Sequence, residues 1–243
     1  MRRRFLAASV AAALCGSSSA VLAGSFFVSP VRLELSAGRP VATVIVRNDD
    51  TVTTVVQLEV VSWGQNATED LYNATPELLA TPPIFSLPAG GKQVVRVGLR
   101  RAPDARQELS YRLFLQEIPP PLTAGFQGMR MALRVGLPVF VAPVATARAN
   151  LTWSAAATPD GAIKVGLVNN GSAHVKIANL QSTVLATSEA SSVEQVSSYV
   201  LPGQSREWLL KGGAPVTAGS KIRLMAHTDS NAEIISALTL GAP

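Results

Sequence analysis

Apolar and polar residues alternate along almost the whole chain, and no segment carries a sustained helical period. Because successive side chains of a strand point to opposite faces, this alternation is typical of strands with one buried face. Gly, Pro, Asn and Asp separate the alternating runs, as they do between the short strands of a sandwich. The pattern predicts an all-β fold with strands within 40–50, 54–63, 92–100, 110–118 and 129–142.

One segment breaks the alternation. The stretch PELLATPPIFSLPAGG, residues 76–91, contains four prolines. Proline cannot donate a backbone hydrogen bond to a strand ladder. We therefore expect this stretch to be a loop with at most one short turn of helix.

The second half of the chain repeats features of the first. VIVRNDD at 44–50 is echoed by VGLVNNG at 165–171, and SLPAGGKQVVRV at 86–97 is echoed by VLPGQSREWLL at 200–210. A small-residue linker follows Pro143. The repeat predicts two immunoglobulin-like β-sandwich domains in tandem, at 24–145 and 146–243, each of the usual size of about 100 residues.

The first residues have the form of an export signal. Three arginines at 2–4 precede an apolar run from Phe5 to Leu14, and Val21 and Ala23 are small enough for a cleavage site. This order predicts a signal peptide at 1–23 and export, which indicates the bacterial periplasm. A lipoprotein modified at Cys15 is the alternative, although Leu14 is a poor residue before such a cysteine.

Removal of residues 1–23 from the 243-residue chain leaves 220 residues and lowers the net charge from +5 to +2. No basic run longer than Arg100-Arg101 remains, so the footprint of a nucleic-acid-binding protein is missing. The single cysteine leaves with the leader, and the hydrophobic core must stabilise the fold without disulfides. No other apolar run reaches the length of a membrane span, so we expect no membrane insertion.

Residues for catalysis are scarce. The mature chain has two histidines, His174 and His227, and no cysteine, so a zinc site would depend mainly on carboxylates. Both histidines are interpreted as ordinary turn or strand residues. No Gly-x-Ser-x-Gly, phosphate-binding or His-Glu-x-x-His motif is present, and only a Ser-His-Asp triad assembled by the fold stays open. We expect no enzyme activity, no metal and no cofactor.

An apolar row in MRMALRVGLPVFVAP, residues 129–143, requires a separate explanation. Met129, Met131, Leu133, Val135 and Leu137 alternate with polar or small residues, so they share one face of a strand. Pro138, which follows directly, indicates an edge position. An apolar strand at a sheet edge promotes aggregation unless a partner uses it.

Five segments in order resemble the periplasmic chaperones of the chaperone-usher pilus pathway, the PapD-like family. The similarity extends over essentially the whole mature chain and is most specific between Thr81 and Pro120. The segments are SPVRLEL, RNDD, TPPIFSLPAGGKQVVRV, YRLFLQEIPP and LPVFVAP.

The resemblance implies two immunoglobulin-like domains set at an angle, with a cleft between them. It also implies a role: these chaperones bind incomplete pilin subunits by donor-strand complementation and deliver them to an outer-membrane usher. Met129, Met131 and Leu133 match the positions that fill the subunit groove, and Val135 continues the row. Self-association of the free chaperone over this strand stays open.

The family also holds the subunit's C-terminal carboxylate on basic residues in the cleft. Arg32 matches the first of them. The family's lysine on the donor strand is replaced by Pro138, and its interdomain arginine by Ala142, as in a divergent branch of the archaic or sigma type. Another base must then serve.

Arg96 is the first candidate for that base, followed by Arg112 and Arg134. Glu117 and Asp229 could still help to set the interdomain angle, although their usual arginine partner is missing.

Two rival functions are considered. A β-sandwich structural or adhesin subunit of a surface fibre would share secretion and strand content. Such a subunit should carry an N-terminal donor extension before a single incomplete domain, whereas GSFFVSPVRLEL enters a strand almost at once. A secreted hydrolase would need a clustered set of acid and base residues, which the sequence does not display.

Overall fold

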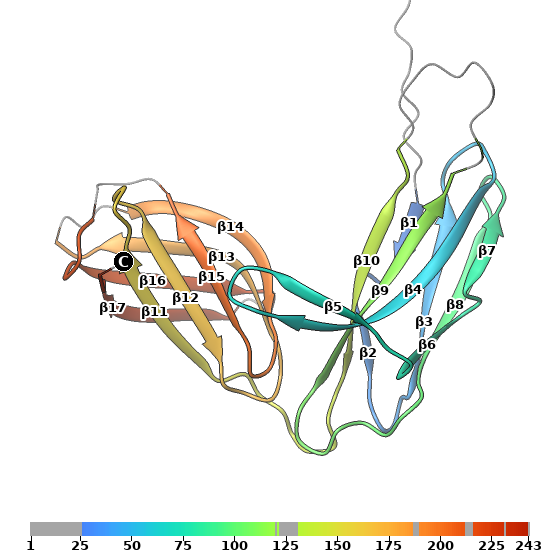
Figure 1. Ribbon diagram of the computed structural model, residues 1–243, viewed down its shortest axis with the longest axis horizontal. Coiled ribbons are helices and arrows are strands. Elements are labelled where there is room, and N and C mark those ends of the chain that lie inside the picture. The colour runs from blue at the N-terminus through green and yellow to red at the C-terminus, as the bar shows by residue number, and fades with distance from the viewer. Residues whose placement is uncertain are drawn as a thin grey trace, which may run out of the picture.

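The computed structural model describes residues 26–119, 121, 131–186, 190–211, 216–230 and 232–242. These residues form seventeen strands and no helix, which confirms the predicted all-β fold. Figure 1 shows two sandwiches set at an angle, and the chain passes from one to the other after β10. The predicted signal peptide, and Cys15 with it, lies outside the described residues.

The first sandwich contains β1 to β10. One sheet has the strand order β1 (Phe26–Ser29), β3 (Val41–Asn48), β8 (Lys92–Leu99), β6 (Leu78–Thr81). The other has the order β2 (Leu33–Leu35), β10 (Arg134–Val141), β9 (Leu109–Ile118), β4 (Thr54–Gln65), β5 (Asp70–Ala74), with β7 (Ile84–Leu87) paired to β4. Alternate residues such as Val44 and Val46 are fully buried between the sheets, whereas Ile45 is exposed. This is the period of two expected from the sequence.

The second sandwich contains β11 to β17. Its sheets have the orders β11 (Leu151–Ala157), β12 (Ile163–Asn169), β15 (Ser205–Leu210), and β14 (Ala190–Val200), β13 (Val175–Val184), β16 (Lys221–Thr228), β17 (Glu233–Thr239). Its core is separate from that of the first sandwich and is centred on residues such as Leu167, Ile177 and Leu224. Each domain therefore has its own hydrophobic core.

The internal repeat is visible in hydrogen bonds. Asn48 and Asn169 are both completely buried, each at the end of a strand. Each amide nitrogen donates to the carbonyl four residues ahead, at 2.7 Å from Asn48 and 2.8 Å from Asn169. Each also donates at 3.1 Å to a carbonyl at the Leu-Pro turn: that of Leu87 within the first turn, or that of Val200 just before the second. Asparagines at corresponding positions thus connect corresponding turns in the two domains, because a buried amide requires partners for its donors.

The expectation of a loop at 76–91 is wrong. The segment contains the two short strands β6 and β7, with Pro82 and Pro83 in the junction between them. Among the described residues, β6 lies at an edge of its sheet and pairs with β8 alone, while β7 pairs with β4 alone. The prolines thus occupy positions where no ladder N–H is needed, although the Pro83 carbonyl still accepts from the Leu58 N–H at 2.8 Å.

Candidate functional site

β10 runs from the tip of the first domain toward the domain junction (Figure 1). It pairs with β9 along its whole length, but with β2 only at Val139–Val141. On the side away from β9, the backbone from Arg134 to Pro138 therefore has no strand partner among the described residues; we call this the open edge. Pro138 lies within it, as its missing N–H predicts.

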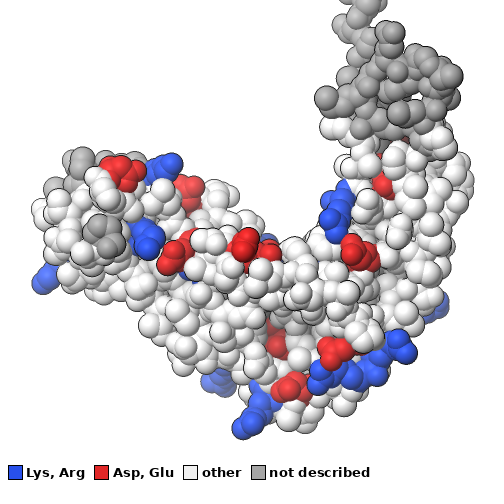
Figure 2. Space-filling view, in the orientation of Figure 1, with Lys and Arg blue, Asp and Glu red and all other residues white. Residues whose placement is uncertain are grey.

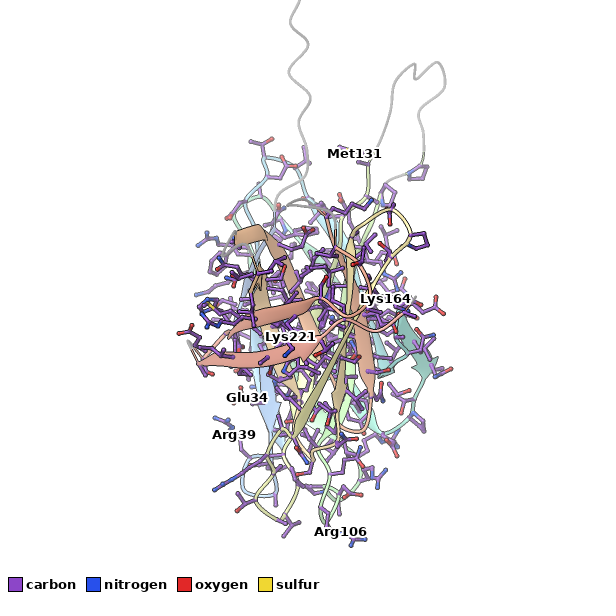
Figure 3. All side chains as sticks on the ribbon, turned by 90° about the vertical axis from the view of Figure 1, so that its left-hand side faces the viewer. Glu34, Arg39, Arg106, Met131, Lys164 and Lys221 are labelled. Carbon is purple, nitrogen blue, oxygen red and sulfur yellow. The ribbon has the colours of Figure 1, made fainter. Side chains whose placement is uncertain are left out.

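The apolar row on β10 passes from solvent into the core. Met131 is 62% exposed, and in Figure 3 it lies at the end of the first domain away from Arg39 and Arg106. Leu133 and Val135 are half-buried, and Val135 packs against the first core. Leu137 is buried at 2% exposure. Met129, the first predicted member of the row, lies outside the described residues.

Hydrogen bonds extend the strand to Leu133. Its carbonyl accepts from the backbone N–H of Glu117 at 2.9 Å, and its N–H donates to the Glu117 carboxylate at 3.1 Å. Glu117 also accepts from Thr54. Its side chain thus holds the start of β10 against β9, and its hydrogen bonds to described residues all lie within the first domain. Its predicted part in the interdomain angle is not supported by this placement.

The opposite face of β10 carries Arg134 and Gly136. The Arg134 guanidinium lies 4.0 Å from the centroid of the Phe114 ring and 2.9 Å from the Glu59 carboxylate. A Cβ on Gly136 would lie 2.9 Å from the same ring, so glycine at this position lets Phe114 cover the strand. Arg134, a candidate for the carboxylate anchor, is thus already paired on this face.

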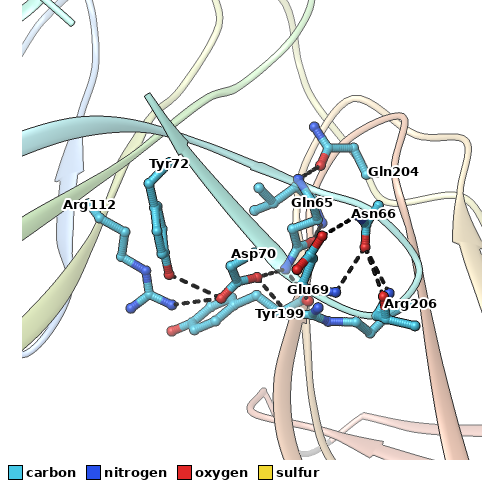
Figure 4. Close-up of polar contacts among 11 residues, drawn as sticks. Gln65, Asn66, Glu69, Asp70, Tyr72, Arg112, Tyr199, Gln204 and Arg206 are labelled. Atoms are coloured by element: carbon cyan, nitrogen blue, oxygen red, sulfur yellow. Dashed lines mark hydrogen bonds and ion pairs between the residues drawn. The ribbon is translucent and has the colours of Figure 1, made fainter. Parts of the chain in front are cut away.

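Arg112 lies directly opposite Pro138 in the β9–β10 register. Its guanidinium stacks over Trp63 at 3.9 Å and is 4.0 Å from the Asp70 carboxylate. Figure 4 shows Arg112 beside Tyr72 and Asp70. The structure therefore brings this predicted candidate close to the position of the missing family lysine, but in contact with other groups.

Arg32 sits just before β2, at the boundary between the domains. It makes ion pairs with Glu34 at 3.1 Å and, across the domain boundary, with Asp229 at 2.8 Å. Partial burial alone would lower the pKa of Arg32, but Glu34, Tyr199 and Asp229 together raise it, so the guanidinium stays charged. Asp229 therefore joins the domains as the sequence suggested, with Arg32 as its partner.

A cavity of about 580 Å³ opens beside this ion pair. Both domains contribute to its wall, and acidic and basic side chains lie along the hollow between the domains (Figure 2). Its lining comprises Pro30, Val31, Arg32, Glu34 and Pro138 from the first domain and Lys176, Tyr199 and Asp229 from the second. We call it the interdomain cavity.

Arg96, the first candidate for a second base, lies elsewhere. It is on the exposed face of β8, in the four-stranded sheet, where its neighbours in register are Thr43 and Thr81. Arg32 leads into a strand of the other sheet. The structure thus places the two arginines on different sheets of the first domain.

The domain junction has a small apolar cluster of its own. Trp63, Phe140 and Leu201 are buried together, with Tyr199 packed against them. The imidazole of His174 stacks on Phe140 with a centroid distance of 3.6 Å, and its Nδ1 lies 2.6 Å from a Glu108 oxygen. The predicted turn histidine is thus part of the interface, which only the docking of the two domains could reveal.

The β4–β5 hairpin reaches across to the second domain (Figures 1 and 4). The Gln65 side chain accepts from the Leu201 N–H at 2.9 Å and donates to the Tyr199 carbonyl at 3.0 Å. At the hairpin tip, the Ala67 carbonyl accepts from the Glu207 N–H at 2.7 Å. These backbone and side-chain bonds connect the hairpin to the second domain at three points and so hold the angle between the domains.

Asp70 in this hairpin pairs with Arg206 of the second domain at 2.5 Å. Burial alone would raise the pKa of Asp70, but a hydrogen bond from Gln65 and the charge of Arg206 outweigh it and hold the pKa below its ordinary value. The ionised form is therefore stabilised by folding. That stabilisation is present above the ordinary pKa and is lost as the pH falls through the folded-state pKa.

Asp70→Asn is expected to lower the free energy of unfolding by about 1 kcal/mol at neutral pH, because the charged partner of Arg206 is lost. The difference from wild type should be constant above about pH 4, shrink as the pH falls further, and disappear only below the folded-state pKa, where Asp70 is protonated in both folded and unfolded states. Denaturant unfolding of both proteins across this range measures it. A difference that is the same at pH 3 and pH 7 would show that the carboxylate charge contributes nothing.

Sequence reasoning missed several residues of this junction, among them Gln65, Lys176 and Tyr199. Nothing local distinguishes them from ordinary strand residues. Within the described part of the chain, no group of three or more His, Cys, Asp or Glu could hold a metal ion. In the same residues, no helix is long and apolar enough to cross a membrane.

Comparison with known structures places the fold among pilus chaperones. A complex from archaic Csu pili of Acinetobacter baumannii, of the chaperone CsuC with the tip adhesion subunit CsuE, matches with a TM-score of 0.65 at 18% identity; the match covers 89% of this chain and 99% of that chain. SafB, described with the SafA pilin of Salmonella enterica, matches at 0.61 and 20% identity over 91% and 99%. The E. coli chaperone DraB matches at 0.59 and 19% over 90% and 97%.

No curated protein matches the sequence significantly. Residues 25–147, however, match the family described as pili and flagellar-assembly chaperone, PapD N-terminal domain. The match spans more than half of the chain and includes every strand of the first sandwich. The chain therefore belongs to the PapD-like family of pili and flagellar-assembly chaperones.

Proposed function

We propose that this protein is a periplasmic chaperone that binds incomplete pilin subunits by strand addition at β10 and delivers them to an outer-membrane usher. The open edge of β10 is the observation that carries the proposal. An unpaired row of backbone N–H and C=O groups is a template for another strand. Here it lies next to Met131 and Leu133, which leave apolar surface available to the same partner.

The side chains of the row support binding in proportion to the surface they still expose. Each apolar side chain that becomes buried contributes about 1.5 to 3 kcal/mol. Met131 offers most of its surface, whereas Leu133 and Val135 are half-buried, and Val135 already packs on the first core. Methionine suits this position because its flexible side chain adapts to different partner grooves. We propose Met129, Met131 and Leu133 as the main subunit contacts, with Val135 continuing the row.

The direction of the bound strand follows from β2. β2 pairs with the edge of β10 from Val139 onward, so a strand added at the open edge cannot extend past Pro138. It must therefore end beside Arg32 and the interdomain cavity. A cationic group at that point favours the carboxyl end of the incoming chain. We therefore propose Arg32 as an anchor for the subunit's C-terminal carboxylate. Arg112 and Arg134 are paired with other groups, and Arg96 lies on the other sheet.

Three further assignments belong to this proposal. Residues 1–23 are a signal peptide that directs the chain to the periplasm. Residues 24–145 form the subunit-binding domain, and 146–243 form the second domain. The usher recognises the loaded chaperone.

The direct test is co-expression in the periplasm with a pilin subunit that lacks its last strand. A complex of one chaperone and one subunit, stable in size-exclusion chromatography, is expected. A peptide that supplies the missing pilin strand should release the subunit, because it competes for the same groove. The proposal is wrong if the subunit stays aggregated, or if this chain is itself found polymerised in surface fibres.

A further inference from the structure

Lys176 is the cation of the interdomain cavity that the sequence did not single out. It lies on β13 of the second domain and lines the cavity together with Arg32 and Pro138. Its backbone carbonyl accepts from the Asp229 N–H at 3.1 Å. This bond ties Lys176 to the residue that pairs with Arg32.

The cations near the cavity differ in what they already bind. Arg32 is paired with two carboxylates, at 2.8 and 3.1 Å, and Arg112 lies against Trp63 and Asp70. The Lys176 ammonium lies 5.4 Å from the centroid of the Tyr199 ring. None of the described carboxylate oxygens lies within 4.0 Å of it. Lys176 is therefore the cavity cation whose charge the described carboxylates do not neutralise.

Because Pro138 stands at the end of the open edge, a terminal carboxylate bound there needs a cation such as Lys176 from elsewhere in the cavity. A strand added to β10 ends where Pro138 meets the cavity, and proline has neither a charge nor a backbone N–H to offer a terminal carboxylate. Arg32 can approach such a group only with the nitrogens that Glu34 and Asp229 leave available. A second donor must therefore come from another wall of the cavity, and Lys176 lies in the wall formed by the second domain.

We propose that Lys176 receives the C-terminal carboxylate of the bound subunit together with Arg32, so that the anchor joins the two domains. This inference rests on the proposed function and adds a specific residue to it. The incoming carboxylate competes with Asp229 for Arg32 and gains Lys176 in exchange. Subunit binding is thereby coupled to the contact between the domains.

The test uses one pilin subunit in two forms, with a free C-terminal carboxylate and with a C-terminal carboxamide. Lys176→Met should weaken binding of the carboxylate form about fivefold, as expected for a half-exposed ion pair. It should leave binding of the carboxamide form unchanged, because that form has no charge for Lys176 to meet. Lys176→Arg should restore most of the affinity for the carboxylate form.

Lys221→Met is the matched control, since Lys221 is exposed at the end of β16 opposite to Asp229. It should bind both subunit forms like wild type. Equal weakening of both forms by Lys176→Met, or no weakening of either, would overturn the assignment. Failure of the proposed function has a different signature, because wild-type chaperone would then bind neither form.

Discussion

Arg32→Ala is expected to weaken subunit capture about a hundredfold, or about 2.7 kcal/mol, because a terminal carboxylate loses charge-assisted hydrogen bonds worth about 1.5 to 3 kcal/mol. The chaperone itself should still fold. Arg32 is partly exposed, and its loss removes only ion pairs at the surface of the cavity. Titration of the purified variant with a pilin subunit, beside a denaturant unfolding curve, measures both effects.

Two controls separate subunit contact from domain contact. Asp229→Asn breaks the same interdomain ion pair but leaves the guanidinium in place. Its affinity for the subunit should equal or exceed that of wild type, because a competitor for Arg32 is weakened. Arg96→Ala removes an arginine from the other sheet and should have no effect. Wild-type capture by Arg32→Ala would remove Arg32 from the site, and equal losses in Arg32→Ala and Asp229→Asn would assign the effect to the domain contact.

Met131→Thr is expected to weaken subunit capture at least tenfold, about 1.4 kcal/mol, while leaving the stability of the free chaperone almost unchanged. Met131 is 62% exposed, so its replacement creates no cavity in the first domain. Threonine keeps the preference for a strand but removes the apolar anchor. If the row binds a partner, denaturant unfolding of this variant should show unchanged stability, and subunit pull-down should show weakened capture.

Leu137→Thr supplies the contrast on the same face of β10. Leu137 is 2% exposed, so this change should cost roughly 2 kcal/mol or more in stability, through a cavity and a buried hydroxyl. If Met131→Thr lowers stability like Leu137→Thr and the folded variant still captures its subunit normally, Met131 belongs to the core. The assignment of the row to a partner would then be abandoned.

The alternation predicted the five strands β3, β4, β8, β9 and β10 of the first domain, because alternation is a local property of the chain. Val44 and Val46 are buried and Ile45 is exposed, as their spacing requires. The internal repeat is visible in the sequence for a similar reason. Asn48 and Asn169 each stand at the end of a strand, where the side-chain amide donates hydrogen bonds to carbonyls at a Leu-Pro turn. The expectation of a loop at 76–91 fails because Pro82 and Pro83 fall between two strands, where no N–H is needed for a ladder, and their place depends on the fold.

Some features of the candidate site likewise follow from the sequence, and others depend on the fold. The apolar row at 129–137 and the edge position of Pro138 follow from residue types and their order alone, because a strand has only two faces and proline lacks a donor. The extent of the open edge, by contrast, depends on where β2 stops, and Arg32 meets Asp229 across 197 positions of sequence. Lys176 and Tyr199 reach the interdomain cavity only because the β4–β5 hairpin and the Trp63 cluster fix the domain angle. By itself, the sequence determined which side chains each strand presents on each face, whereas only the tertiary structure decided which of them meet, since such contacts depend on strand register and domain packing.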